Sequence, residues 1–380
     1  MRLRPLAFAA TALALALSWS TAAEAYPQFQ FSTGAKRCSL CHYSPTGGGL
    51  INPFGRSSSA DSISQTAGNP DLLHGLYKEP DWFRWSADLR FAAVAKGGAD
   101  SDLLLFPMQG DYYQLVKFGK QITWYTAVGP RAGARSEERQ SFPERLTARE
   151  LYFMWRKKNR GYYVRAGRFF APFGIRSQNH LDYVRRYNGF HSFEETLNLN
   201  VGRVENADEF HVTAFTAIPY ALLGNGPRGF GATAYYERRP GKGATTALAG
   251  QAKVRLGDVD RRYVLGGVGK HYLEGANTLL MAELDVALQQ FDISGAPSRA
   301  QLLGYLGATY FPIQGIMVSG VLEHYDPDLS IEDTQTIGFS AILQYFPRSH
   351  HELYLMAKTE LVGGFADTNN LLMFQYHYWL

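Results

Sequence analysis

Polar and apolar residues alternate with a period of two along most of the chain after Trp82. The first such stretch reads WFRWSADLRFAAV, in which Arg84 and Arg90 fall on one side and Leu89 and Phe91 on the other. Successive side chains of a β-strand point to opposite faces, so the pattern predicts a strand with one wet and one apolar face. The stretches LLMAELDVALQQ and ELYLMAKTE repeat it.

Roughly sixteen alternating segments can be counted, which is near the size at which a membrane barrel encloses an aqueous lumen. Their connections alternate in length: FGK, KKNRG, VENAD, RPGKGA, LEGAN, PIQG and PRSHH are short, whereas others, such as APFGIRSQNHLDYVRRYNGFHSFEE, are long. Short periplasmic turns and longer outer loops are typical of outer-membrane barrels. We therefore predict an all-β fold, a roughly 16-stranded transmembrane barrel over 81–380. A soluble β-sandwich, the alternative, has no reason to keep this alternation.

The last alternating stretch, LLMFQYHYWL, supports the membrane assignment. Leu372, Phe374, Tyr376 and Tyr378 share one face and form an aromatic-rich stripe that would face lipid. The stretch is similar to the C-terminal signature of bacterial outer-membrane proteins, with Leu380 at the position where phenylalanine is commonest.

Composition and the N-terminus indicate an exported protein. The chain has 380 residues, 14% of them aromatic, and a formal net charge of +4, which is too small to indicate a nucleic-acid partner. Residues 1–25 combine an initial positive charge, the apolar run from Leu6 to Leu17 and a small-residue stretch, Ala23-Glu24-Ala25. This pattern predicts a signal peptide. The alternative, an uncleaved anchor helix, needs a longer apolar run.

The only two cysteines, Cys38 and Cys41, stand directly before His42 in KRCSLCH. In an exported chain this spacing predicts covalent attachment of one haem c, with both thiols bonded to the macrocycle and the imidazole on the iron. A simple disulfide, half of a zinc site and a thioredoxin-like redox pair are the alternatives. Zinc requires a further ligand cluster, and a redox pair requires a βαβ context; the neighbouring sequence offers neither.

A second iron ligand is expected from a histidine or methionine elsewhere in the fold. Within 26–80, His74 is the one other histidine, and there is no methionine. His74 is therefore the predicted distal ligand, with Met108 or a histidine of the barrel lumen as the alternative. If His74 is an ordinary surface residue, five-coordinate iron is expected.

The segment 26–80 is rich in Gly, Ser and Pro and poor in apolar residues, as SPTGGGLINPFGRSSSADSISQTAGNP shows. A segment of this size and composition cannot bury a haem by itself. We therefore predict three parts: a signal peptide (1–25), a short monohaem cytochrome c segment (26–80) and the barrel (81–380), which lends its walls to the haem.

With Cys38-Ser39-Leu40-Cys41-His42 followed by Pro53-Phe54-Gly55-Arg56 and a barrel, the chain resembles the fused monohaem cytochrome-porins of iron-oxidising and related bacteria. The insert SPTGGGLIN differs from that family. The resemblance implies electron transfer across the outer membrane rather than substrate chemistry, with the haem segment entering the barrel from the periplasmic side. Its implied partners are outer-membrane lipid, a periplasmic carrier such as a c-type cytochrome, and an extracellular reductant or acceptor, with Fe(II) as the first candidate.

Two other functions compete with electron transfer. The chain could form a solute-diffusion porin in which the haem segment is only a plug, or it could be a haem sensor or peroxidase. A peroxidase needs a distal acid-base pair, which the segment does not offer. The inward positions of Arg84, Arg90, Lys253 and Arg255 predict a partly basic lumen, able to pair with haem propionates or to favour anions.

Overall fold

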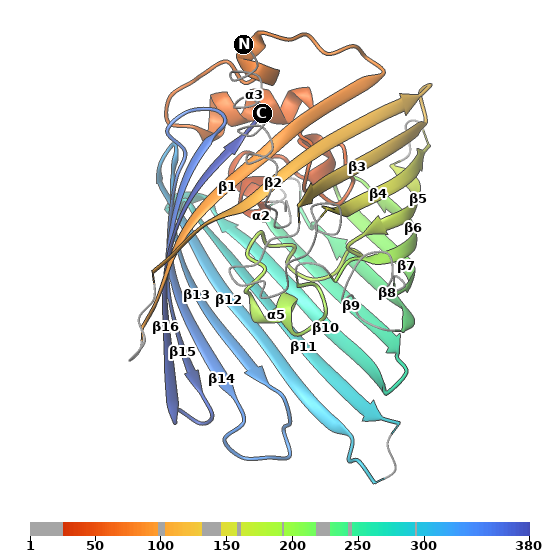
Figure 1. The fold of residues 1–380 in the computed structure, drawn as a ribbon, viewed down its shortest axis with the longest axis vertical. Coiled ribbons are helices and arrows are strands. Elements are labelled where there is room, and N and C mark those ends of the chain that lie inside the picture. The colour runs from red at the N-terminus through yellow and green to blue at the C-terminus, as the bar shows by residue number, and fades with distance from the viewer. Residues whose placement is uncertain are drawn as a thin grey trace, which may run out of the picture.

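The computed structural model describes residues 26–97, 103–130, 146–157, 161–191, 194–217, 229–241, 245–292 and 295–380. The signal-peptide prediction for 1–25 lies outside these residues. In the described part, sixteen strands form one closed antiparallel barrel in which each strand pairs with its neighbours in sequence and β16 closes onto β1 (Figure 1). The all-β barrel and its strand number are thus confirmed.

The strands are β1 Phe83–Gly97, β2 Leu103–Phe118, β3 Ile122–Pro130, β4 Leu146–Arg156, β5 Tyr162–Phe169, β6 Thr196–Val204, β7 Asp208–Thr216, β8 Phe230–Arg238, β9 Thr246–Leu256, β10 Asp260–Leu273, β11 Thr278–Phe291, β12 Arg299–Ile313, β13 Ile316–Asp326, β14 Thr336–Tyr345, β15 His351–Val362 and β16 Asp367–Trp379. The helical turns are α2 Pro27–Ser32, η1 Cys38–Leu40, α3 Pro53–Ser58, η2 Ser59–Ile63, η3 Leu72–Gly75, α5 Tyr183–Arg186 and η4 Glu274–Ala276.

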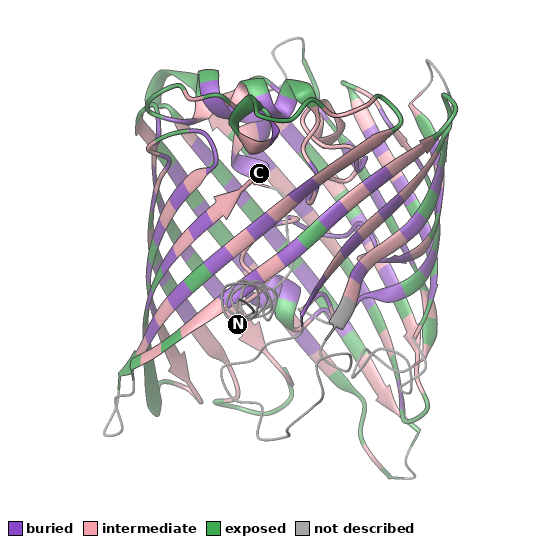
Figure 2. Cartoon of the chain, turned by 45° about the horizontal axis from the view of Figure 1, so that its top comes forward, coloured by how far each residue is buried: buried purple, intermediate pink, exposed green. Residues whose placement is uncertain are grey.

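The alternation in the sequence corresponds to two faces of the barrel wall. In β11, Glu283 and Asp285 are buried on the inner face, while Leu284 and Val286 are exposed on the outer one. Figure 2 shows the same alternation of buried and exposed residues along neighbouring strands. The exposed apolar face is the one a bilayer covers, and the polar face turns inward. No helix in the described ranges is long and apolar enough to cross a membrane.

The closure of the barrel determines which residues meet on its inner face near the chain ends. Arg90 of β1 pairs with His377 of β16, and Asp88 pairs with Trp379. The register between β1 and β2 shifts between Arg90 and Phe91, which marks a β-bulge. Residues almost three hundred positions apart thereby lie side by side.

The predicted short stretches connect each even-numbered strand from β2 to β14 to the strand that follows it. They lie at the end of the barrel where β1 begins. Several connections at the other end are longer, but 257–259 between β9 and β10 and 363–366 between β15 and β16 are as short as the turns. The β5–β6 connection, expected as an outer loop, instead folds into the lumen with α5 (Figure 1). Its residues Phe173, Tyr183 and Phe190 are buried.

Inner-wall carboxylates hold the β5–β6 connection in the lumen. The backbone N–H of Ile175 donates to Glu283 at 2.6 Å, and the Tyr183 hydroxyl donates to Glu360 at 2.9 Å. These bonds satisfy polar groups that leave water when the loop packs against the wall. The lumen of the described barrel is therefore partly filled by its own chain.

The segment before β1 lies at the mouth formed by the short turns (Figure 1). Gln65 N–H donates to Phe346 O at 2.8 Å, and Gln314 Nε2 donates to Ser64 O at 2.6 Å. Deeper in the barrel, Phe31 of α2 belongs to the same buried cluster as Phe173 of the β5–β6 connection. The segment thus closes one end of the barrel and reaches its interior.

Candidate functional site

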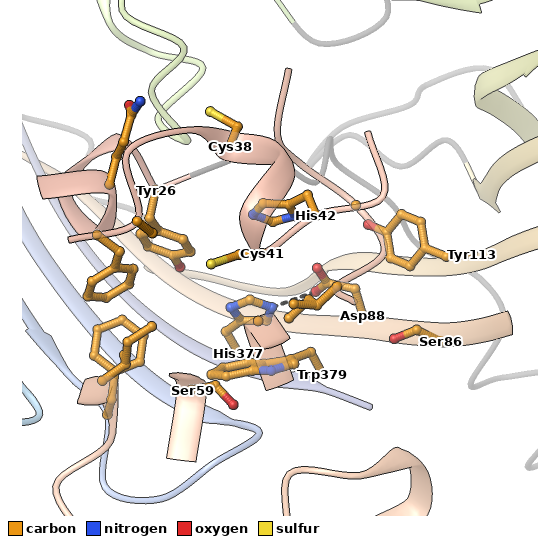
Figure 3. Close-up of a pocket in the computed structure, with 18 of the residues that line it drawn as sticks. Tyr26, Cys38, Cys41, His42, Ser59, Ser86, Asp88, Tyr113, His377 and Trp379 are labelled. Carbon is orange, nitrogen blue, oxygen red and sulfur yellow. Dashed lines mark ion pairs between the residues drawn. The ribbon is translucent and has the colours of Figure 1, made fainter. Parts of the chain in front are cut away.

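A cavity lies between the N-terminal segment and the barrel wall formed by β1, β2 and β16. It encloses about 990 Å³ of space between atoms, including the part open to solvent. The segment contributes Cys38, Cys41 and His42 to its lining, and the wall contributes His377 and Trp379 (Figure 3). Its surface is mostly apolar.

A single tight turn brings the three residues of the cysteine motif together. In η1, the N–H groups of Cys41 and His42 both donate to Cys38 O, at 3.2 and 3.0 Å. Both cysteines are free, so the disulfide alternative is not formed in this structure. The two thiols and the imidazole therefore line one cavity.

The short helix α3 packs against the backbone of this turn. Asn52 caps the helix by accepting from Gly55 N–H at 3.0 Å, and its side-chain amide donates to Leu40 O at 2.7 Å. A Cβ on Gly55 would lie 2.4 Å from Cys41 O, so only glycine allows α3 to approach the Cys41 backbone this closely. Arg56 pairs with Glu79 at 3.1 Å and holds α3 to the rest of the segment. The Pro-Phe-Gly-Arg stretch is thus a backing element for the cysteine turn.

The glycine-rich insert fits against the lumen wall. His42 and Ile51 form an antiparallel bridge, so the residues between them make a hairpin that projects into the barrel. Gly49 has a φ of +58°, and a Cβ there would lie 1.9 Å from the Tyr125 hydroxyl. Arg156 of β4 donates to Tyr43 O at 2.9 Å. The insert is therefore shaped to the wall of this barrel.

The protonation of the three motif residues bears on what they can bind. Removal from water raises the pKa of the Cys38 thiol, and removal from water together with the neighbouring Cys38 raises the pKa of Cys41 to about 11. A thioredoxin-like pair needs a lowered thiol pKa, so that alternative is disfavoured.

The His42 imidazole is neutral at neutral pH. Burial lowers its pKa to about 4, although the backbone of Gly48 and Gly49 partly opposes this shift. Its Nδ1 is buried without a hydrogen-bond partner. A neutral imidazole with an unused nitrogen is the form that ligates a metal.

Of the predicted second ligands, neither His74 nor Met108 lines the cavity, whereas a histidine of the barrel lumen, His377, does. His74 is exposed in η3, where its Nε2 lies 3.0 Å from the Tyr378 hydroxyl and its ring centre 4.6 Å from that of His350. Met108 lines a separate small cavity that also includes His180. The structure therefore brings together Cys38, Cys41 and His42 but not His74 or Met108.

The sequence analysis allowed for a lumen histidine but named none of the wall residues of the cavity. His377, Asp88 and Tyr26 line it, and the first two are buried (Figure 3). The alternation of the last strand contained a signal, because it places His377 on the inner face of the barrel, opposite the aromatic stripe on the outer face. Nothing local, however, predicts that this position reaches the cysteine motif.

The donor set of the cavity fits a haem c. Two thiols and a neutral imidazole match its covalent and iron-binding groups, and apolar walls match its macrocycle. Arg37 lines the cavity as well, and its buried Nε has no hydrogen-bond partner, which is suited to an anionic propionate. Among the described residues, no group of three or more His, Cys, Asp or Glu could hold a bare metal ion.

Comparison with known proteins shows the fold. No family model and no curated protein matches the chain. Among solved structures, OmpTdeltaL8, a loop L8 deletion mutant of the Vibrio cholerae outer membrane protein OmpT, matches with a TM-score of 0.61 and 9% identity over 78% of this chain and 99% of that chain.

Two further structures match similarly. The high-pH structure of Pseudomonas putida OprB gives a TM-score of 0.58 and 11% identity over 78% of this chain and 94% of that chain. The anion-selective porin from Comamonas acidovorans gives a TM-score of 0.55 and 10% identity over 78% of this chain and 99% of that chain. At such identities the likeness shows the fold alone. This chain therefore forms a porin-like barrel of the outer-membrane type.

Proposed function

We propose that this protein transfers electrons across the outer membrane through one haem c bound covalently in the cavity. The observation that carries the proposal is the convergence of Cys38, Cys41 and His42 on one mostly apolar cavity, closed on its other side by the barrel wall. When bound, the haem supplies a one-electron iron couple. The protein in this proposal is a cytochrome-porin of the iron-oxidiser type and carries out no substrate chemistry of its own.

The residues of the chain have separate roles in this proposal. Cys38 and Cys41 attach the macrocycle, His42 ligates the iron, and Arg37 pairs with a propionate. The wall of β1, β2 and β16 excludes water from the haem and lowers the local dielectric constant, which is one way in which a protein sets a reduction potential.

The sidedness follows from barrel topology. Short turns lie on the periplasmic side of outer-membrane barrels, so the haem segment would face the periplasm and a carrier such as a c-type cytochrome. The opposite mouth would face an extracellular reductant, with Fe(II) as the first candidate. His74 lies at the mouth near Tyr378, so it could ligate the iron only if η3 moved towards the cavity.

Haem attachment is tested on the purified mature protein by its pyridine haemochrome spectrum and intact mass. We expect one haem per chain, and no haem in the Cys38→Ala/Cys41→Ala double variant. His42→Ala should change the visible spectrum, whereas His74→Ala should leave it unchanged if the side chain stays on Tyr378. Haem stain at the wild-type level in the double variant would refute the proposal.

A solute-diffusion porin is the second candidate, and the solved structures favour it because one of them is titled an anion-selective porin. Inward Lys253 and Arg255 would suit anions. The buried β5–β6 connection opposes a wide pore. Planar-bilayer conductance separates the two functions, since a diffusion porin conducts small ions freely whereas a plugged conduit does not.

A further inference from the structure

A network of buried polar groups lies on the wall side of the cavity. Tyr26 Oη donates to Glu352 Oε2, and His377 Nδ1 lies 2.8 Å from the same oxygen. His377 Nε2 lies 2.7 Å from Asp88 Oδ1. This network links the N-terminal segment to β15, β16 and β1. Figure 3 shows His377 and Asp88 on the barrel side of the cavity, across from His42.

The surroundings of His377 require a charged imidazole. Both of its ring nitrogens face a carboxylate oxygen, at 2.7 and 2.8 Å. A neutral imidazole carries one N–H, so one nitrogen would present its lone pair to an anion. With a proton on each nitrogen, the contact with Glu352 becomes a charge-assisted hydrogen bond and the contact with Asp88 a favourable ion pair.

The charges of the cluster balance only when His377 is protonated. Asp88 and Glu352 supply two negative charges, and Asp88 also pairs with Arg90, whose Nε lies 3.5 Å from Asp88 Oδ1. Asp88, Arg90, Glu352 and His377 are all less than a tenth exposed. A buried carboxylate without a compensating charge is strongly unfavourable. Charged His377 and Arg90 together cancel the two carboxylates.

We propose that His377 is a fixed positive charge that tunes the reduction potential of the cofactor in this cavity, an inference that rests on the proposed haem. It does not ligate the iron in this proposal, because Nδ1 is hydrogen-bonded to Glu352 and Nε2 is held against Asp88 as an ion pair. Reduction removes one positive charge from the iron, so a neighbouring cation favours the reduced state. Removing that cation leaves Asp88 and Glu352 with a net negative charge beside the cofactor and favours the oxidised state.

Measuring the reduction potential of the haem-loaded protein in a double-mutant cycle tests this role of His377. Optical redox titrations at neutral pH compare wild type with His377→Gln, Glu352→Gln and the double variant. For His377→Gln we expect the ratio of reduced to oxidised haem at a fixed ambient potential to fall about tenfold, which is ~59 mV for a one-electron couple. Glu352→Gln should raise the ratio, and the double variant should return close to wild type because it removes one charge of each sign.

His271→Gln is the matched control, since His271 is exposed and bonded to Thr246 at 2.8 Å; its ratio should not move. Ratios within about twofold of wild type in both single variants, about a third of the decade that 59 mV represents, would overturn the inference. Heat-modifiable migration in gels shows that each barrel is folded.

A second measurement judges His377 without the haem. In the Cys38→Ala/Cys41→Ala protein, ¹⁵N NMR at neutral pH should show two protonated ring nitrogens for His377. A neutral tautomer would overturn the inference. A wild-type protein without haem would instead refute the proposed function, while this NMR result would still decide whether His377 carries its charge.

Discussion

Gly55 of the N-terminal segment has no room for a side chain. A Cβ at this position would lie 2.3 Å from Ile51 Cγ2 and 2.4 Å from Cys41 O. One of these neighbours is backbone and carries the second thiol, so the clash cannot be relieved by a side-chain rotation. The position of Cys41 therefore depends on a glycine fourteen residues further along the chain.

We expect Gly55→Ala to displace the cysteine turn and to reduce haem attachment without unfolding the barrel. Overpacking of this kind typically costs roughly 1–3 kcal/mol, and here the cost falls on a small segment rather than on the sheet. Haem stain relative to barrel protein on a gel measures the effect. Gly275→Ala is the control, because nothing lies within 4 Å of a Cβ there. Equal stain in both variants would contradict the role given to Gly55.

The sequence predicted some residues of the site and not others for a physical reason. Cys38, Cys41 and His42 are contiguous, so one turn brings them together whatever the rest of the fold does. Asp88 and His377 meet only because β1 closes on β16, and no local pattern encodes that closure. The prediction of His74 rested on its being nearby in sequence, and the structure places it on Tyr378 at the barrel mouth.

At the scale of elements, strand period and turn length were sufficient to predict the wall. The β5–β6 connection was not predictable in this way, because alternation reports the two faces of a strand and says nothing about where a loop lies. Its aromatic residues were a weak signal, since Phe173, Tyr183 and Phe190 in an exposed loop would be unusual. The charged residues of the lumen wall supply the polar partners that this loop needs.

Shortening the β5–β6 connection should open the barrel. Replacing residues 176–190 with a short Gly-Ser linker removes α5 and the buried Tyr183 and Phe190, so we expect a several-fold rise in single-channel conductance over wild type. Shortening the 327–335 connection between β13 and β14 is the control and should have a much smaller effect. A wild-type conductance as high as that of the loop variant would favour the diffusion-porin function instead.

For the molecule as a whole, the segment before β1 and the β5–β6 connection enter the barrel from opposite ends and meet in one buried cluster that contains Phe31 and Phe173. The cavity with Cys38 and Cys41 lies on the segment side of that contact, against β1 and β16. A haem there would be separated from both aqueous phases by protein rather than by an open pore. This arrangement suits the passage of electrons without the passage of solutes.

Electron transfer by the complete protein is therefore the decisive prediction. We expect liposomes that contain the haem-loaded protein to reduce trapped oxidised cytochrome c when ferrous citrate is added outside, because cytochrome c cannot pass the barrel and only electrons can reach it. The reduction rate is followed optically. Liposomes with the Cys38→Ala/Cys41→Ala barrel are the matched control and should show only background reduction, since the wall and the loop are unchanged. Equal rates in the two preparations, or free passage of small solutes without reduction of cytochrome c, would contradict transport by the haem and leave the barrel as a porin.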